Sequence, residues 1–265
     1  MSHTAPVGAV TNAPRIVSLV PSLTELLFAL DLGDHVVGRT GFCVHPRDAV
    51  RRVRKIGGTK TVDVQAVIDL APTHLVVNVD ENEKPTVDRL AAHVPNLIVT
   101  HPLVALDTLD LFERFGRAFD RTAKAARLAE SWRAAHDATR ATQWRRLRVV
   151  YLIWKGPWMT VSHGTYIADM LSQVGLDVVV PDSDRRYPEV DWTVLAPNSI
   201  DLVMFSSEPY RFRERDTLAF AREHGLAPER CAVVDGEMTS WYGPRAIEGL
   251  RYLVQWRASI DARIG

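Results

Sequence analysis

Apolar and polar positions alternate along the first hundred residues in a way that predicts strands and helices in turn. Short apolar runs bounded by Gly, Pro or polar residues are typical of buried strands, whereas apolar residues three or four positions apart are typical of helices. We expect strands at 15–20, 35–38, 75–79 and 96–100, and helices at 22–33, 62–70 and 85–93. This alternation predicts a parallel α/β sheet.

The first of these helices carries its own end signals. Ser22 with Glu25 three residues later is typical of a capping box, and Gly33 is a suitable left-handed terminator. The segment 39–61 is rich in Gly and basic residues, so we expect a long loop there with at most one helical turn.

A second α/β unit follows a helical region. Residues 107–144 contain no proline and repeat large apolar side chains at helical spacing, which predicts one or two long helices. The alternation then restarts, with strands expected at 145–154, 178–180, 201–205 and 232–234, helices at 165–174, 191–196, 217–224 and 244–262, and a polar loop at 181–188.

The two halves echo each other weakly, since Ser22 and Gly33 have the same separation as Gly164 and Gly175. We therefore expect an α/β fold of two Rossmann-like lobes joined by a long rigid backbone helix. The expected parts are a first lobe at 15–120, the connecting helix at 121–145 and a second lobe at 146–265. Two lobes joined by helix rather than flexible linker predict a ligand cleft at their junction.

Composition and charge exclude several classes of protein. The 265 residues include 32 Lys plus Arg and 32 Asp plus Glu, so no overall field favours nucleic acid, and 46% of residues are apolar, as in ordinary globular proteins. No stretch is apolar for long enough to insert into a membrane. Residues 1–14 lack the features of a secretory signal, which favours the cytoplasm, or the periplasm if the true start lies upstream. The two cysteines, Cys43 and Cys231, favour a reducing compartment.

Common enzymatic motifs are absent from the sequence. Gly57-Gly58-Thr59-Lys60 lacks the upstream glycine of a phosphate-binding loop, so an ordinary turn is the better interpretation. Cys43 and His45 lie in one loop, with His101 and His163 in others, and together they leave open a metal-dependent enzyme. Isolated histidines are more often structural, so we rank this alternative below a binding protein and assign no catalytic residue and no resident metal.

The aromatic residues give a more specific indication. Several fall at the ends of expected strands or in the loops that follow, where open α/β sheets bind ligands. Trp154 directly extends a buried strand, so a core position is an equally good interpretation of that residue. With nearby charged residues, the set predicts a cleft for a large, flat, partly polar ligand. The members are Phe42, Trp154, Trp158, Tyr187, Trp241 and Tyr242, with Glu208, Asp235, Glu237 and Arg245.

Several segments resemble class III solute-binding proteins, the helical-backbone family that binds cobalamin and iron siderophores. The resemblance rests on residues 15–30 (RIVSLVPSLTELLFAL), on Phe42-Cys43 with Pro46, on Ile56-Gly57-Gly58 and on the strand that follows Pro72. In the second half, residues 162–175, Tyr187-Pro188 and Trp241-Tyr242-Gly243-Pro244-Arg245 look most like the cobalamin-binding branch. The resemblance covers residues 15 to 252.

The resemblance implies a non-catalytic receptor that holds a corrinoid such as cobalamin, as a ligand rather than a built-in cofactor. It places Phe42, Thr59, Trp154, Tyr187 and the loop 235–245 at ligand-contacting positions. Thr59 departs from an aromatic residue found in some relatives. A haem or ferric-siderophore receptor, which would favour a tyrosine ligand or an arginine cluster, is the alternative within the binding class.

The resemblance also concerns partners. Transporter-docking relatives carry a glutamate at the start of one helix in each lobe, and these positions are Gln65 and Thr193 here. Because both docking charges are missing, we expect no docking to an ABC permease. A monomeric binder of a small-molecule metal chelate, with no nucleic-acid partner, is therefore the expectation.

Overall fold

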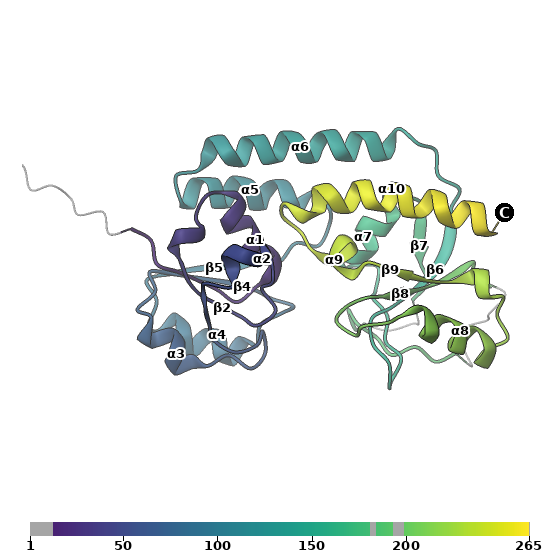
Figure 1. Cartoon of the computed structure of the whole chain (residues 1–265), viewed down its shortest axis with the longest axis horizontal. Helices are drawn as coiled ribbons and strands as arrows, with labels where there is room; N and C mark the ends of the chain where they lie inside the picture. Colours follow the sequence, from purple (N-terminus) through teal and green to yellow (C-terminus); the bar gives the residue numbers. More distant parts are fainter. Residues whose placement is uncertain (1–12, 181–183, 193–198, 265) are drawn as a thin grey trace, which may run out of the picture. The chain divides into compact units, whose positions relative to one another are not determined.

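The computed structural model describes residues 13–180, 184–192 and 199–264. These residues group into two compact units, Met1–Thr100 and His101–Gly265, each built on its own parallel sheet (Figure 1). This confirms the expected pair of α/β lobes. The roles expected for 15–120, 121–145 and 146–265 as lobe, connecting helix and lobe stay predictions.

The first unit has a five-stranded sheet with the order β3-β2-β1-β4-β5, and every paired neighbour is parallel. Each strand except the short β3 corresponds to an apolar run of the sequence. The strands are β1 (Ile16–Ser18), β2 (Val36–Arg39), β3 (Arg54–Lys55), β4 (His74–Asn78) and β5 (Asn96–Thr100). The helices are α1 (Pro21–Ala29), α2 (Arg47–Val50), α3 (Val64–Asp69) and α4 (Lys84–Ala91), with a 3-10 turn at Gly33–His35.

The core of the first unit lies between the sheet and its covering helices. Val17 of β1 and Leu75 of β4 are fully buried and pack with Val67 of α3 and Leu90 of α4. Strands buried in this way read as continuous apolar runs, which is why the sequence predicted them.

The ends of α1 differ from the sequence prediction. Pro21 occupies the first helical position and Val20 is the N-cap without a side-chain hydrogen bond, so the capping box expected at Ser22 is wrong. The fixed φ of proline suits the first turn, which moves the helix start upstream and places Ser22 inside it. The left-handed residue after the helix is Asp31, with φ of 55°, rather than Gly33.

The second unit contains a four-stranded parallel sheet with the order β7-β6-β8-β9. Its strands are β6 (Leu147–Leu152), β7 (Leu176–Val178), β8 (Leu202–Ser206) and β9 (Cys231–Val234). Its helices are α5 (Asp107–Ala118), α6 (Thr122–Arg140), α7 (Tyr166–Ser172), α8 (Glu214–Glu223), α9 (Gly236–Ser240) and α10 (Arg245–Ile264), with a 3-10 turn at Pro228–Arg230. Most of the helix expected at 191–196 lies outside the described residues, and α9 was not predicted.

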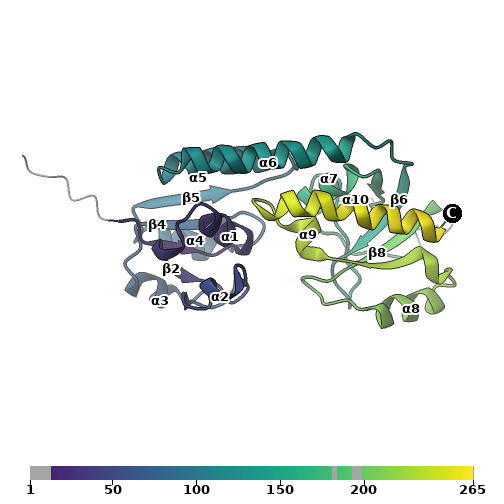
Figure 2. The same cartoon turned by 45° about the horizontal axis from the view of Figure 1, so that its top comes forward.

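Two long helices lie side by side in this unit. α6 packs against both α5 and α10, and α6 and α10 run alongside each other in both views (Figure 2). Trp132 of α6 is fully buried, which explains the helical spacing of apolar residues in this region. The expectation of one or two long helices between 107 and 144 is confirmed by α5 and α6. None of the helices described is both long and apolar enough to cross a membrane.

The C-terminal helix is fixed to the start of the second sheet by a buried cation. Arg257 of α10 is fully buried and donates a hydrogen bond of 2.8 Å to the carbonyl oxygen of Arg145, just before β6. Its guanidinium group also pairs with Asp261 and lies 5.9 Å from the Trp144 ring centroid. One side chain therefore connects the two ends of the segment 144–261.

Candidate functional site

The carboxyl ends of the strands in the second unit bring candidate residues to one edge of the sheet. Trp154 follows β6, Glu208 follows β8 and Asp235 follows β9 directly. Because all four strands are parallel, these positions share the edge at which open α/β sheets bind ligands. The structure therefore brings these candidates to one edge, and a ligand contact there stays a prediction.

Glu208 is held by donors from the segment that follows β9. Its Oε1 accepts a hydrogen bond of 2.6 Å from Nε1 of Trp241 and one of 3.3 Å from Oγ of Ser240. Residues 208 and 241 are far apart in sequence, so the loop after β8 and the end of α9 meet at this carboxylate.

Gly236, the first residue of α9, packs closely against Glu208. A Cβ atom at Gly236 would lie 2.5 Å from Cγ of Glu208 and 2.5 Å from Oγ of Ser206, so only glycine fits there without displacement. Asp235 caps the helix, and its Oδ1 accepts hydrogen bonds from the backbone N–H groups of Glu237 at 3.0 Å and Met238 at 3.4 Å.

Buried hydroxyl groups connect α9 to the sheet. The Tyr151 hydroxyl of β6 donates to Oγ of Ser206 at 3.0 Å and lies 2.5 Å from Oγ1 of Thr239 in α9. Burial is the main reason that the pKa of Tyr151 is raised well above its usual value. Tyr151 therefore stays neutral and connects three elements.

One cation accompanies the carboxylates of this edge. Nη1 of Arg245, at the start of α10, lies 3.4 Å from Oε2 of Glu237, and its guanidinium carbon lies 5.3 Å from the Trp241 ring centroid. Arg245 is only 9% exposed, so the fixed pair is largely removed from water.

The pKa of Glu208 is raised from 4.5 to about 7. Burial is the largest cause, and the hydrogen bond from Trp241 opposes it. The negative charge of Glu237 raises the pKa further, while Ser240 lowers it and Asp235 raises it slightly. The edge therefore contains one carboxyl group that changes its protonation near neutral pH.

The aromatic candidates of the second unit fall into different environments. Trp154 is 41% exposed, and its ring lies 5.7 Å from that of Tyr210 in an edge-on arrangement, so it is not a core residue. Trp158 is half-buried and stacks on Phe212 at 5.9 Å within the aromatic core of this unit. Tyr187 is half-buried, with the guanidinium carbon of Arg186 6.0 Å from its ring centroid.

Trp241 and Tyr242 are buried, in contrast to the exposed aromatic surface that their loop position indicated. Trp241 is 8% exposed and Tyr242 is 6% exposed, with the Tyr242 ring 5.7 Å from that of Tyr166. The short helix α9 turns this segment inward, which the sequence did not reveal. The structure gives both rings a packing role, and any contact with a ligand stays a prediction.

In the first unit, Phe42 and Thr59 lie near each other. Phe42 is 63% exposed, and its ring approaches the position that a Cβ of Gly58 would occupy to 3.4 Å. The backbone oxygen of the neighbouring Thr59 accepts a hydrogen bond of 3.1 Å from Nδ2 of Asn82. Phe42 therefore lies beside Gly58, the residue that precedes Thr59 in the chain.

The alternative of a metal or nucleophilic centre at Cys43 receives no support. Cys43 is fully buried, and burial raises the pKa of its thiol against the hydrogen bonds from Thr24 and Thr40. The sulfur lies 3.1 Å from Oγ1 of Thr24 and 3.2 Å from Oγ1 of Thr40. Across the described part of the chain, no three His, Cys, Asp or Glu residues are grouped as metal ligands would be.

Gln65 lies on the exposed first turn of α3, as the resemblance implied for a docking position. Its Nε2 donates a hydrogen bond of 2.8 Å to Oδ1 of Asp69, and Asp63 caps the same helix through the N–H of Ala66. The carboxylates of Asp63 and Asp69 therefore lie at the same helix as the neutral Gln65. Thr193 lies outside the described residues.

Several polar residues that form hydrogen bonds at the carboxyl ends of the strands in the second unit were not predicted. They are Tyr151, Ser206, Thr239 and Ser240. The sequence did contain a signal for the helix α9, because Asp235-Gly236 directly after a strand is a suitable N-cap. The contacts of Ser206 and Thr239 depend on packing between elements and leave no such pattern.

Comparison with known proteins agrees with this architecture. A family model described as "Periplasmic binding protein" matches residues 16–226. The chain is 25% identical over 251 residues to an uncharacterized ABC transporter substrate-binding lipoprotein, YvrC, of Bacillus subtilis (strain 168), covering 91% of this chain and 79% of that protein. It is 24% identical over 181 residues to a vitamin B12-binding protein of Yersinia pestis (strain Pestoides F), covering 67% of this chain and 64% of that protein. The match thus spans just under two thirds of the latter relative.

Solved structures share the fold at low sequence identity. The periplasmic vitamin B12 binding protein BtuF of Vibrio cholerae superposes with a TM-score of 0.79 at 16% identity, over 94% of this chain and 98% of that chain. The periplasmic heme-binding protein RhuT from Roseiflexus sp. RS-1 superposes with a TM-score of 0.81 at 19% identity, over 96% of this chain and 100% of that chain. Proteins named for two different ligands thus share this fold.

Proposed function

Because the chain belongs to the periplasmic binding protein family, we propose that it binds a corrinoid and delivers it to an ABC importer. The chain is a binding protein rather than an enzyme, as its family is. The resemblance to solute-binding proteins seen in the sequence agrees with this membership. The ligand and the delivery are the proposed parts.

The carboxylate cluster at the edge of the second sheet supports the choice of ligand. Glu237 and Asp235 lie close enough to raise the pKa of Glu208, which accepts a hydrogen bond from Trp241, and Arg245 pairs with Glu237. Such an edge presents hydrogen-bond acceptors and negative charge, so it favours a ligand that offers N–H donors and disfavours a multiply anionic one.

A corrinoid meets these requirements because its rim carries amide side chains, whose N–H groups donate to carboxylates, around a broad apolar macrocycle. Haem has a similar flat body, but its two propionates would face the carboxylates of this edge. Trp154, at 41% exposure, supplies exposed aromatic surface in the second unit, as a macrocycle requires. We retain Phe42, Thr59 and Tyr187 as proposed contacts.

Haem binding is the second candidate, and one observation favours it. Tyr187 is half-buried beside Arg186, and a tyrosine near an arginine is a suitable group for ferric iron or a propionate. A haem complex through this tyrosine would show a characteristic Soret band, which a corrinoid complex lacks.

We propose that the chain acts outside the cytoplasm and meets a permease there. The named relatives are periplasmic or lipoprotein substrate-binding proteins. These names favour the periplasmic alternative over the cytoplasmic expectation drawn from residues 1–14. The neutral Gln65 is accompanied by the carboxylates of Asp63 and Asp69, which weakens the argument against docking.

Calorimetric titration of the ligand-free protein with cyanocobalamin, dicyanocobinamide and haemin tests this proposal. We expect saturable binding of the two corrinoids with a stoichiometry near one, and a rise of the unfolding midpoint by mass action. Glu208→Gln should weaken cyanocobalamin binding by about tenfold through loss of an ionic hydrogen-bond acceptor. Glu248→Gln, an exposed carboxylate of α10, is the matched control and should have no effect.

The proposal fails if haemin saturates the protein more tightly than either corrinoid and gives a Soret band that Tyr187→Phe abolishes. Absence of heat and of thermal shift at high corrinoid excess would also exclude it.

A further inference from the structure

One short segment of the first unit holds a concentration of positive charge that the proposed ligand site does not use. Residues 47–55 contain five cationic side chains and the single acidic residue Asp48, although the chain as a whole has equal numbers of positive and negative groups, 32 of each. We call this group the basic surface. Its members are Arg47, Arg51, Arg52, Arg54 and Lys55.

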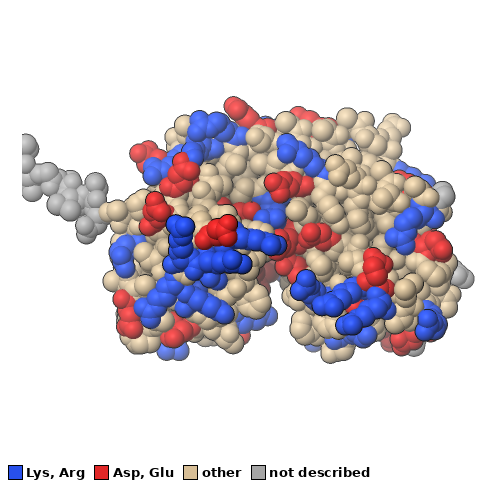
Figure 3. Space-filling model, viewed as in Figure 1, with Lys and Arg blue, Asp and Glu red and all other residues tan. Residues whose placement is uncertain are grey.

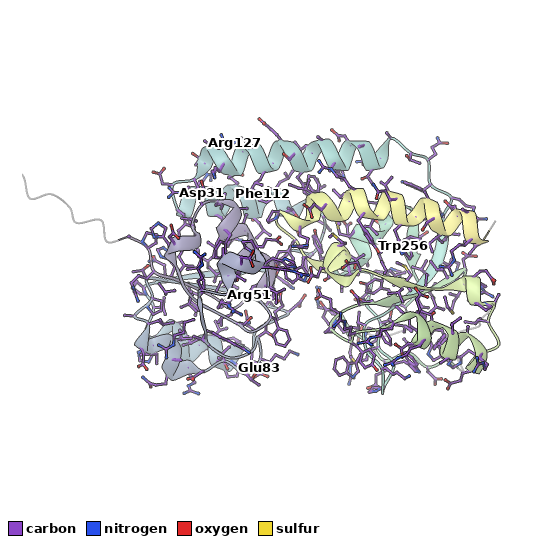
Figure 4. All side chains as sticks on the ribbon, in the orientation of Figure 1. Asp31, Arg51, Glu83, Phe112, Arg127 and Trp256 are labelled. Atoms are coloured by element: carbon purple, nitrogen blue, oxygen red, sulfur yellow. The ribbon has the colours of Figure 1, made fainter. Side chains whose placement is uncertain are left out.

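All five side chains of the basic surface are exposed. Among the residues that the structure describes, the ion pair of this group joins Arg51 to Asp48 at 3.9 Å, with side-chain exposures of 75% and 97%, so solvent screens it strongly. Figure 3 shows Lys and Arg side chains gathered on the face of the first unit that carries α2, and Figure 4 labels Arg51 in the same region. The positive charge there is therefore largely uncompensated.

A fixed backbone carries these cations. The side chain of Arg39 in β2 donates from Nε to the carbonyl oxygen of Val50 at 3.2 Å and from Nη1 to that of Thr40 at 3.1 Å, which ties the end of α2 to the sheet. The buried Val50 anchors α2 from inside. β3 is held in parallel register on β2. The backbone is thus ordered while the charged ends extend into solvent.

Protection of a sheet edge explains only part of this surface. β3 is the edge strand of its sheet, and charged side chains on an edge prevent pairing with other chains. That role accounts for Arg54 and Lys55, which form β3. It does not account for Arg47, Arg51 and Arg52, which lie on or next to α2, outside the sheet.

We propose that the basic surface binds the phosphate headgroups of an anionic lipid bilayer. A bilayer offers many phosphates that move laterally, so it matches cations whose ends are not held in place by partner carboxylates. Val44, an apolar residue 41% exposed just before α2, can enter the headgroup region beside these cations. A face of another protein would instead require carboxylates in fixed register with each arginine.

Flotation of the full chain with lipid vesicles tests the proposal. Vesicles of phosphatidylcholine and phosphatidylglycerol at 7:3 should bind the protein at low salt, and pure phosphatidylcholine vesicles should not. Each cation near an anionic surface contributes roughly a fivefold gain in affinity. The triple substitution Arg47→Gln, Arg51→Gln, Arg52→Gln should therefore reduce binding by roughly a hundredfold.

A matched control changes net charge equally at another place. Arg127, Arg133 and Arg140 are exposed on α6, and their replacement by Gln should reduce binding by less than about threefold. Circular dichroism and thermal unfolding establish that both triple variants are folded. No binding by the unmodified protein at low salt, or an equal loss in both variants, would overturn the proposal. Capture of soluble polyglutamate without vesicle binding would also overturn it and indicate an acidic protein partner.

Discussion

Replacement of Glu208 by glutamine should make the second unit more stable at alkaline pH. The carboxyl group is largely buried beside Glu237 and Asp235, so its ionised form is disfavoured in the folded state. Glutamine has nearly the same shape, keeps an oxygen that can accept the 2.6 Å hydrogen bond from Trp241, and cannot ionise.

The direction follows from the raised pKa of Glu208, about 7 in the folded protein against 4.5 in the unfolded chain. Below pH 4.5 both states are protonated and the full stability is present. As pH rises from 4.5 to about 7, the unfolded chain loses its proton first, and stability falls. The total loss is about 3 kcal/mol, from roughly 1.4 kcal/mol per pKa unit.

Urea unfolding at pH 5 and pH 8 measures this difference. Glu208→Gln and the unmodified protein should differ by less than about 1 kcal/mol at pH 5, and the variant should be more stable by about 3 kcal/mol at pH 8. The exposed Glu248→Gln serves as the control, and its stability relative to the unmodified protein should be the same at pH 5 and pH 8. Equal destabilisation of the variant at both pH values would contradict this prediction, because the effect would then come from lost packing rather than from ionisation.

Three further predictions concern burial and capping. Trp241→Ala should lower the unfolding free energy by about 3 kcal/mol or more because the ring is 8% exposed, whereas Phe42→Ala, at 63% exposure, should change it by less than about 0.5 kcal/mol; urea midpoints that reverse this order would contradict the packing described. Asp63→Ala should cost about 1 kcal/mol in the same assay and Asp63→Asn much less, because either oxygen can cap α3; an equal cost would show that charge matters more than the cap. Cys43 and Cys231 should react with a thiol reagent at pH 8 only after unfolding, because both are buried and their thiol pKa values are raised; rapid labelling of the folded protein would show that the burial is wrong.

The sequence predicted most elements because their formation depends on local pattern. Runs such as 75–79 and 201–205 correspond to β4 and β8 within a residue or two. The wrong or missing predictions concern the start of α1 and the helix α9. Pro21 moved the start of α1. The helix α9 has a local signal in its N-cap Asp235, but the contact between the hydroxyl groups of Tyr151 and Thr239 that holds it leaves no local pattern.

The candidate site was predictable at the level of the sheet edge but not of its contacts. Glu208 and Asp235 each follow a strand, so parallel topology alone places them together. The hydrogen bond from Trp241 to Glu208 joins residues far apart in sequence and depends on how α9 turns the chain. The burial of Trp241 has the same origin, which is why the loop position indicated exposure.

The buried Arg257 has a consequence for the order in which the chain can fold during synthesis. The first unit uses contiguous residues that end at Thr100, so all of its sheet is available early. The second unit contains the contact between Arg257 and the carbonyl of Arg145, and Arg257 leaves the ribosome 112 residues after Arg145. Stalled or prematurely terminated chains should therefore contain a folded first unit and a second unit that proteases can still degrade. A stop codon a few residues before Arg257 would give the same product permanently.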